Sequence, residues 1–89
     1  MGDQRQLQDW YNAMDFPSQI RAGRVFVRTI YRQPVHHPFK AISFRDEYAD
    51  GQNRLLAEVH YYQKPDGTKT EPDPKILFRN GVTYILAQD

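Results

Sequence analysis

The sequence contains no cysteine among its 89 residues, which excludes a disulfide framework, a thiol nucleophile and a thiolate metal site. No apolar run approaches the roughly 20 residues of a transmembrane helix, and the first residues lack the apolar stretch of a secretory signal. The five glycines are scattered, so the glycine-rich loops that bind phosphates or dinucleotides are absent. We therefore expect a cytoplasmic protein with no membrane contact and no cofactor.

Aromatic residues are abundant by comparison, with six Tyr, five Phe and one Trp. Each can bury a large apolar area, so they can form a core although only 39% of the chain is hydrophobic. A chain of 89 residues has room for one such core and not for two. We predict a single domain over residues 1–89.

Charge is distributed unevenly along the chain, although the net charge is only +1. Residues 1–20 carry one base and three acids (1 − 3 = −2), and residues 46–89 carry five bases and eight acids (5 − 8 = −3). Residues 21–45 carry six bases and no acid, which gives +6. This stretch predicts an acidic partner, unless the fold places the later acids beside these bases.

The first segment, about residues 4–15, has the spacing of an amphipathic helix. Its apolar side chains fall at i, i+3, i+4 and i+7, on Leu7, Trp10, Tyr11 and Met14. Phe16-Pro17 predicts the end of this helix, because the residue before a proline avoids the helical region. We expect Trp10 to pack against the face of the sheet that carries Val25 and Val27.

The rest of the chain predicts five short strands, at about residues 24–32, 39–45, 54–63, 75–79 and 82–87. Residues 46–53 predict a hairpin loop, and Asn80-Gly81 predicts a tight turn. Residues 64–74 predict a surface loop, because prolines interrupt the hydrogen-bond ladder of a sheet.

Strands joined by short loops favour antiparallel pairing, since parallel neighbours need long crossovers. We therefore predict an α+β fold in which one N-terminal helix packs on a mainly antiparallel sheet of about five strands. The other face of this sheet remains open, and we expect a partner or a second copy of the chain to bind there.

The first candidate site is the strand at residues 24–32. Simple alternation places Val25, Val27, Thr29 and Tyr31 inward, and Arg24, Phe26, Arg28, Ile30 and Arg32 outward. Guanidinium groups around an aromatic ring could bind nucleic acid, and arginine also pairs with carboxylates on an acidic protein. Lys40 extends this predicted partner-binding set. The alternative is a solvated strand whose arginines pair with Glu58 or Asp46 of a neighbouring strand.

The second candidate site is Glu58 and His60, which alternation places on one face with Tyr62. A carboxylate base, an imidazole acid and an arginine that binds the phosphate, here Arg32, are sufficient for metal-free RNA cleavage. This combination of a carboxylate, an imidazole and a guanidinium is similar, in residue types alone, to the active sites of small microbial ribonucleases. The alternative is a cross-strand ion pair.

Two further patterns resemble metal sites only weakly. His36 and His37 are adjacent in an extended segment, so they point to opposite sides and cannot easily chelate one ion. Asp73 and Lys75 match half of a metal-dependent nuclease site, but the neighbouring prolines favour a rigid loop. We expect no metal site.

The sequence therefore favours a small protein that binds an acidic partner, either nucleic acid or an acidic protein surface, through an arginine-rich strand face. The first alternative is a metal-independent endoribonuclease that uses Glu58, His60 and an arginine. The second is a homo-oligomer without a ligand, which pairs through the open sheet face.

Overall fold

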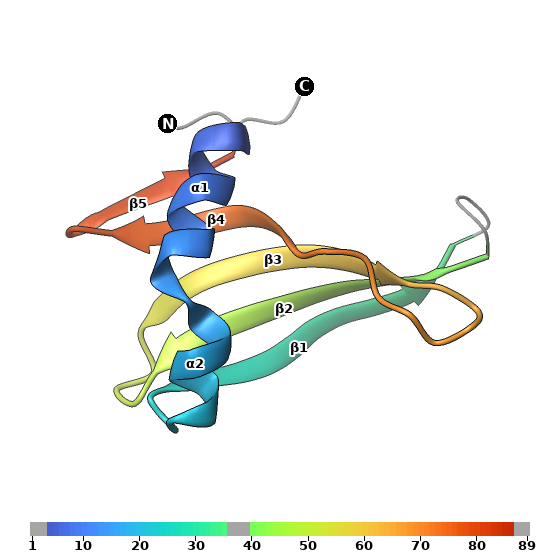
Figure 1. The fold of residues 1–89 in the computed structure, drawn as a ribbon, viewed down its shortest axis with the longest axis horizontal. Helices are drawn as coiled ribbons and strands as arrows, with labels where there is room; N and C mark the ends of the chain where they lie inside the picture. The colour runs from blue at the N-terminus through green and yellow to red at the C-terminus, as the bar shows by residue number, and fades with distance from the viewer. Residues whose placement is uncertain (1–3, 36–39, 87–89) are drawn as a thin grey trace.

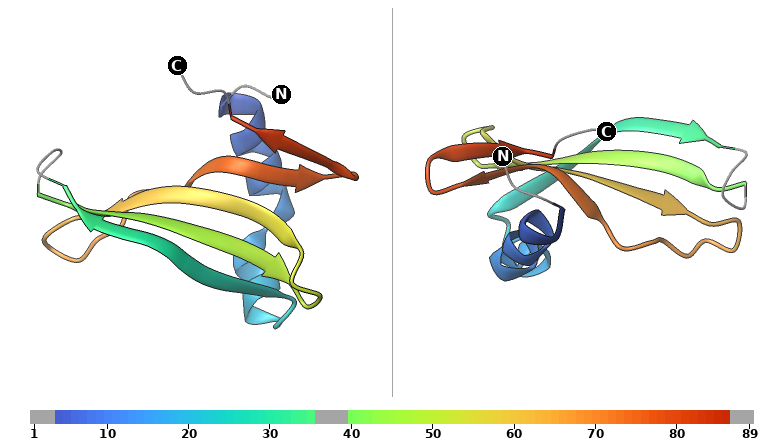
Figure 2. Two further views of the ribbon diagram at one scale, coloured as in Figure 1. Left: turned by 180° about the vertical axis from the view of Figure 1, so that it is seen from behind. Right: turned by 90° about the horizontal axis from the view of Figure 1, so that it is seen from above.

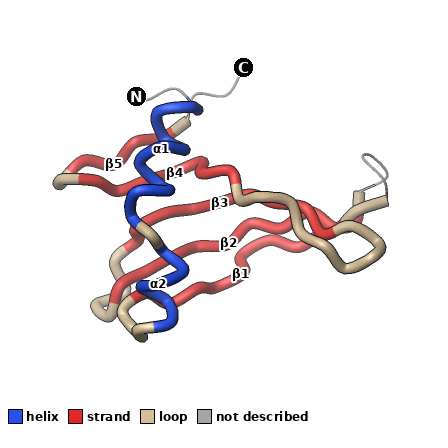
Figure 3. Tube along the Cα trace, viewed as in Figure 1, coloured by secondary structure: helices blue, strands red, loops and turns tan. Residues whose placement is uncertain are grey.

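The structure is a computed structural model that describes residues 4–35 and 40–86. The helices are α1 (Gln4–Met14) and α2 (Phe16–Arg21). The strands are β1 (Val25–Pro34), β2 (Ile42–Asp50), β3 (Leu55–Gln63), β4 (Asp73–Arg79) and β5 (Val82–Ile85) (Figure 1, Figure 3). A helical N-terminal segment and a five-stranded antiparallel sheet confirm the predicted α+β fold.

The sheet is a simple meander, with the strands in the order β1-β2-β3-β4-β5 and every neighbouring pair antiparallel. Both helices lie on one face, where α1 packs against β4 and α2 against β1 (Figure 1). Seen from above, no helix formed by the described residues lies on the other face, which is called the open face below (Figure 2). Within residues 4–35 and 40–86, no helix is long and apolar enough to cross a membrane.

The helical segment breaks at Asp15, one residue earlier than predicted. Asp15 adopts a left-handed conformation with φ 49°, and Phe16 then begins α2 with Pro17 in its first turn. The first helix therefore ends within one residue of its predicted bound, and the prediction is wrong only in placing Phe16 outside a helix. Proline is well tolerated in a first helical turn, because its missing N–H has no partner there in any case.

The core lies between the helices and the sheet. Its buried side chains are Leu7, Tyr11, Phe16, Val25, Tyr48, Ala57, Val59, Tyr61 and Leu77. Trp10 packs at the edge of this core and not against Val25 and Val27 as predicted. Its ring centroid lies 4.7 Å from that of Tyr84, and the Arg79 guanidinium lies 4.4 Å from it. This follows from the position of α1, which lies over β4.

β2 extends further along the chain than the sequence predicts. Residues 46–53 were expected to form a loop, but β2 continues to Asp50 and the turn covers residues 51–54. The Asp50 carboxylate accepts backbone N–H bonds from Gln52 and Arg54, which stabilises this tighter turn. Asn80 and Gly81 have positive φ angles of 53° and 80°, which confirms the second predicted turn.

β4 begins at Asp73, inside the predicted surface loop of residues 64–74. Pro74 is fully buried and lies opposite Val59, at a point where the pairing of β3 with β4 skips Lys75. Proline is acceptable at such a bulge because the ladder is already interrupted there. The expectation that the prolines keep Asp73 out of the sheet is therefore wrong.

Candidate functional site

A β-bulge in β1 reverses the predicted alternation. Thr29 lies opposite Asp46 and Tyr31 lies opposite Arg45, so the pairing of β1 with β2 skips Ile30. One extra residue moves every later side chain of the strand to the other face. Tyr31, which alternation placed inward, therefore lies on the open face.

The same bulge places Arg32 on the helix side of the sheet. Arg32 lies opposite Phe44, and its guanidinium is 5.8 Å from the centroid of that ring. Phe44 in turn stacks on the buried ring of Tyr61, with centroids 5.1 Å apart. The prediction that the arginines of residues 24–32 share one face is therefore wrong.

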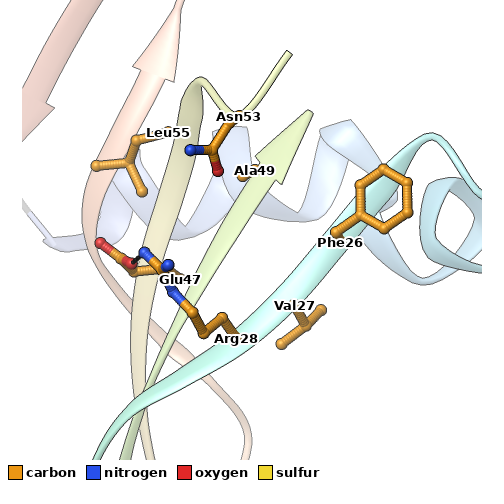
Figure 4. A pocket seen from close by; sticks show the side chains of 7 residues that line it. All are labelled: Phe26, Val27, Arg28, Glu47, Ala49, Asn53 and Leu55. Atoms are coloured by element: carbon orange, nitrogen blue, oxygen red, sulfur yellow. Dashed lines mark hydrogen bonds and ion pairs between the residues drawn. The ribbon is translucent and has the colours of Figure 1, made fainter. Parts of the chain in front are cut away.

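On the open face, Arg28 is paired with an acid. Its Nη2 donates to Glu47 Oε1 at 2.6 Å, and Figure 4 shows the two side chains meeting across β1 and β2. The acid is Glu47, and not Glu58 or Asp46 as the alternative expectation had it. Phe26, Ala49 and Leu55 line a hollow beside this pair (Figure 4).

Leu55 lies on this face because of a second bulge. It is opposite Ala49, whereas Ala57 is opposite Tyr48, so the pairing of β2 with β3 skips Leu56. Uninterrupted alternation along β3 would place Leu55 on the same face as Ala57, and the bulge reverses this as it does in β1.

β1 forms one edge of the sheet and is unusually exposed. Val25 is its only buried residue, and the nine residues that follow are all exposed. Several of these are large apolar side chains, with exposed fractions of 57% for Phe26, 43% for Val27 and 42% for Ile30. Arg24 is also exposed and lies directly before the strand.

A second group of polar residues lies on the open face over β2 and β3. It consists of Ser43, Arg45, Glu58 and His60 and is called the open-face cluster below. Arg45 lies directly opposite His60, and its Nη1 is 3.9 Å from Glu58 Oε2. The Ser43 hydroxyl is hydrogen-bonded to His60 Nε2 at 2.8 Å. Ile30 and Tyr31 of β1 complete the shallow hollow above these four residues.

The structure thus brings Glu58 and His60 together as predicted, but with Arg45 in place of Arg32. Sequence reasoning missed Arg45, Ser43 and Tyr31, because their positions depend on strand register. Arg45 was recognisable only as one base of the acid-free stretch. Lys40 is exposed, with φ 56°, and precedes β2. His36 and His37 lie outside the described residues.

No family model, no curated protein and no solved structure matches this chain. What the site can do follows from its own residues. Among residues 4–35 and 40–86, no three His, Asp or Glu side chains are grouped so that they could hold a metal ion.

The electrostatic environment of His60 favours the neutral imidazole. Burial lowers the pKa of His60 below its ordinary 6.5, the charges of Lys75 and Arg45 lower it further, and Asp73 opposes them. The unfolded chain therefore binds this proton more readily than the folded chain does. The stability that neutral His60 contributes is complete above pH 6.5 and is lost as the pH falls below that value towards the folded pKa.

We expect an NMR titration to find the pKa of His60 below 6.5, and Lys75→Gln to raise it. His60→Gln assigns the imidazole signal among the three histidines of the chain. Lys64→Gln removes the same charge from an exposed loop residue and should leave the titration unchanged. A His60 pKa at or above 6.5 would contradict the environment described here.

Proposed function

We propose that this protein binds an acidic segment of another protein as an added strand along β1. The observation that supports this proposal is the edge itself. Within residues 4–35 and 40–86, no strand pairs with the outer side of β1, which is ten residues long. Long exposed edges are usually shortened, covered or interrupted, because their free N–H and C=O groups pair with other chains. Strand addition uses those same groups for affinity.

The side chains of β1 favour a strand over a nucleic acid. The bulge places Arg28 on the open face and Arg32 on the helix side. A nucleic acid backbone would bind best to arginines that lie on a single face of the sheet. An added strand, in contrast, presents its own side chains to both faces, as β1 does. Carboxylates on either side of an acidic strand can then meet an arginine, which pairs with them in bidentate geometry.

Charge also distinguishes an acidic partner from a second copy of the chain. Residues 24–34 contain three arginines and no acidic residue. Pairing of two β1 edges would concentrate six guanidinium groups (2 × 3) along one seam, with no carboxylate from either strand to offset them. We therefore expect a heterologous partner that alternates acidic and apolar residues.

The test measures binding of a labelled eight-residue peptide that alternates glutamate with valine, by fluorescence anisotropy at low salt. Substitution of Arg24, Arg28 and Arg32 by Gln should weaken binding by about threefold to 150-fold, since each of the three exposed ion pairs contributes about 0.2–1 kcal/mol. The matched control substitutes Arg54, Lys64 and Lys69, which lie outside β1, and should bind as the unmodified protein does.

Two modified peptides test whether binding uses the backbone. N-methylation at every second residue removes the ladder hydrogen bonds on one side of the peptide. We expect one methylated set to abolish binding and the alternate set to preserve it. Equal effects of both sets would overturn strand addition. If β1 binds single-stranded nucleic acid and not the acidic peptide, the partner is a nucleic acid. If ultracentrifugation shows that the protein dimerises through β1, the partner is a second copy of the chain. Either result would overturn the proposal of an acidic protein segment.

A further inference from the structure

The open-face cluster differs from the other ion pairs of residues 4–35 and 40–86 in that its arginine lies further from its carboxylate. Arg28 and Arg54 approach their carboxylates to 2.6 Å and 2.8 Å, as expected of a formed hydrogen bond, whereas Arg45 stays 3.9 Å from Glu58. The Arg45 side chain is 39% exposed beside a hollow. Its donors are therefore placed to bind an anion that enters this hollow.

The other members of the cluster supply a base and an acid beside that anion. Glu58 and His60 alternate along β3 and face the same side, about 7 Å apart along the strand. The hydrogen bond between the Ser43 hydroxyl and His60 Nε2 and the edge contact with the Tyr62 ring hold the imidazole in place. Tyr31 lies at the rim of the hollow, where its ring offers a surface on which a base can stack.

We propose that the open-face cluster cleaves single-stranded RNA without a metal ion. Glu58 accepts the proton of a ribose 2′-OH while the 2′-oxygen attacks the adjacent phosphorus. Arg45 stabilises the negative charge that develops on the phosphoryl oxygens. The new bond joins the 2′-oxygen to phosphorus, and the bond from phosphorus to the 5′-oxygen breaks. Protonated His60 donates its proton to the departing 5′-oxygen. The products are a 2′,3′-cyclic phosphate and a 5′-hydroxyl.

The charges around His60 determine the pH at which this reaction is fastest. Arg45 from β2 and Lys75 from β4 lower the pKa of His60, and Asp73 from β4 opposes them. The reaction needs ionised Glu58 together with protonated His60. Activity should therefore follow a bell-shaped profile whose maximum lies below pH 6.5, since the acidic limb of such a profile belongs to the base and the alkaline limb to the acid.

The experiment incubates the full chain with a labelled single-stranded RNA of mixed sequence in EDTA, at pH values from about 3.5 to 8 that span the ordinary pKa values of Glu and His. We expect cleavage with cyclic phosphate ends and none of single-stranded DNA of the same sequence, which lacks the 2′-OH. Glu58→Gln and His60→Gln should each lower the rate by about 10²–10⁴. Arg45→Gln should lower it by about 10²–10³, as expected for loss of one charge-stabilising donor.

Arg54→Gln is the matched control, because Arg54 also pairs with a carboxylate but lies in the turn between β2 and β3. It should cleave at the original rate. Thermal melts establish that each variant is folded, and Glu58→Asp, which keeps the charge, should retain more activity than Glu58→Gln. The proposal is overturned if no RNA is cleaved at any pH, if the ends are not cyclic, or if cleavage survives in folded Glu58→Gln and His60→Gln.

Discussion

Phe16→Ala should lower the free energy of unfolding by about 3–5 kcal/mol, the usual cost of truncating a buried aromatic side chain. Phe16 is 2% exposed and begins α2. Its ring centroid lies 5.3 Å from that of Tyr11 and 5.0 Å from that of Tyr48, so it connects both helices to β2. Removing the ring leaves a cavity at this junction, because close-packed neighbours relax only in part around the space that is left.

The measurement is urea unfolding followed by circular dichroism, with the slope of the transition compared between variants. Phe26→Ala is the matched control, since the same side chain is 57% exposed on the open face. We expect it to cost less than about 1 kcal/mol, because little apolar area leaves water there. Equal losses from the two substitutions would mean that α2 does not pack on the sheet as described.

Asp46→Ala should lower the free energy of unfolding by about 2–4 kcal/mol, because two hydroxyl groups lose a charged acceptor. Asp46 is 7% exposed on the helix side of the sheet. It accepts hydrogen bonds from Thr29 Oγ1 at 2.8 Å and from the Tyr61 hydroxyl at 3.1 Å. These bonds allow a carboxylate to lie inside a strand beside the core, where an unpaired charge would be costly.

A double-mutant cycle separates this hydrogen bond from general packing effects. After Tyr61→Phe, the loss caused by Asp46→Ala should be smaller than in the unmodified protein, by about 1.5–3 kcal/mol for a bond to a charged group. Asp66→Ala serves as the control, because Asp66 accepts bonds from Thr68 in an exposed loop. It should cost less than about 1 kcal/mol. Additive losses at Asp46 and Tyr61 would show that the two side chains do not interact.

Hydroxyl ionisation in the same region should be suppressed. Burial and the hydrogen bond to Asp46 raise the pKa of Tyr61 to about 12, and burial also raises the pKa of Tyr48. The carboxylate that stabilises β2 therefore also keeps its tyrosine neighbour neutral. This hydrogen-bonded group connects β1, β2 and β3 on the side opposite the open-face cluster.

The sequence alone determined those features that depend on neighbouring residues. The apolar spacing of Leu7 and Tyr11 determined which side of α1 is buried, and Asn80-Gly81 determined the last turn, because both follow from local backbone geometry. The order of the elements and the antiparallel sheet followed from short connections between strands. That Glu58 and His60 lie on the same face of the sheet follows from the two-residue repeat of a strand alone.

Tertiary structure decided which arginines meet those residues. The three bulges skip Ile30, Leu56 and Lys75, and each depends on how a strand matches its neighbour. A skipped residue reverses the two faces of a strand, and no pattern within that strand reveals it. For this reason Arg32 moved to the helix side, and Arg45 came to lie opposite His60. The residue types of the open-face cluster could be read from the sequence. Which of them lie together depends on the register of the strands in the whole sheet.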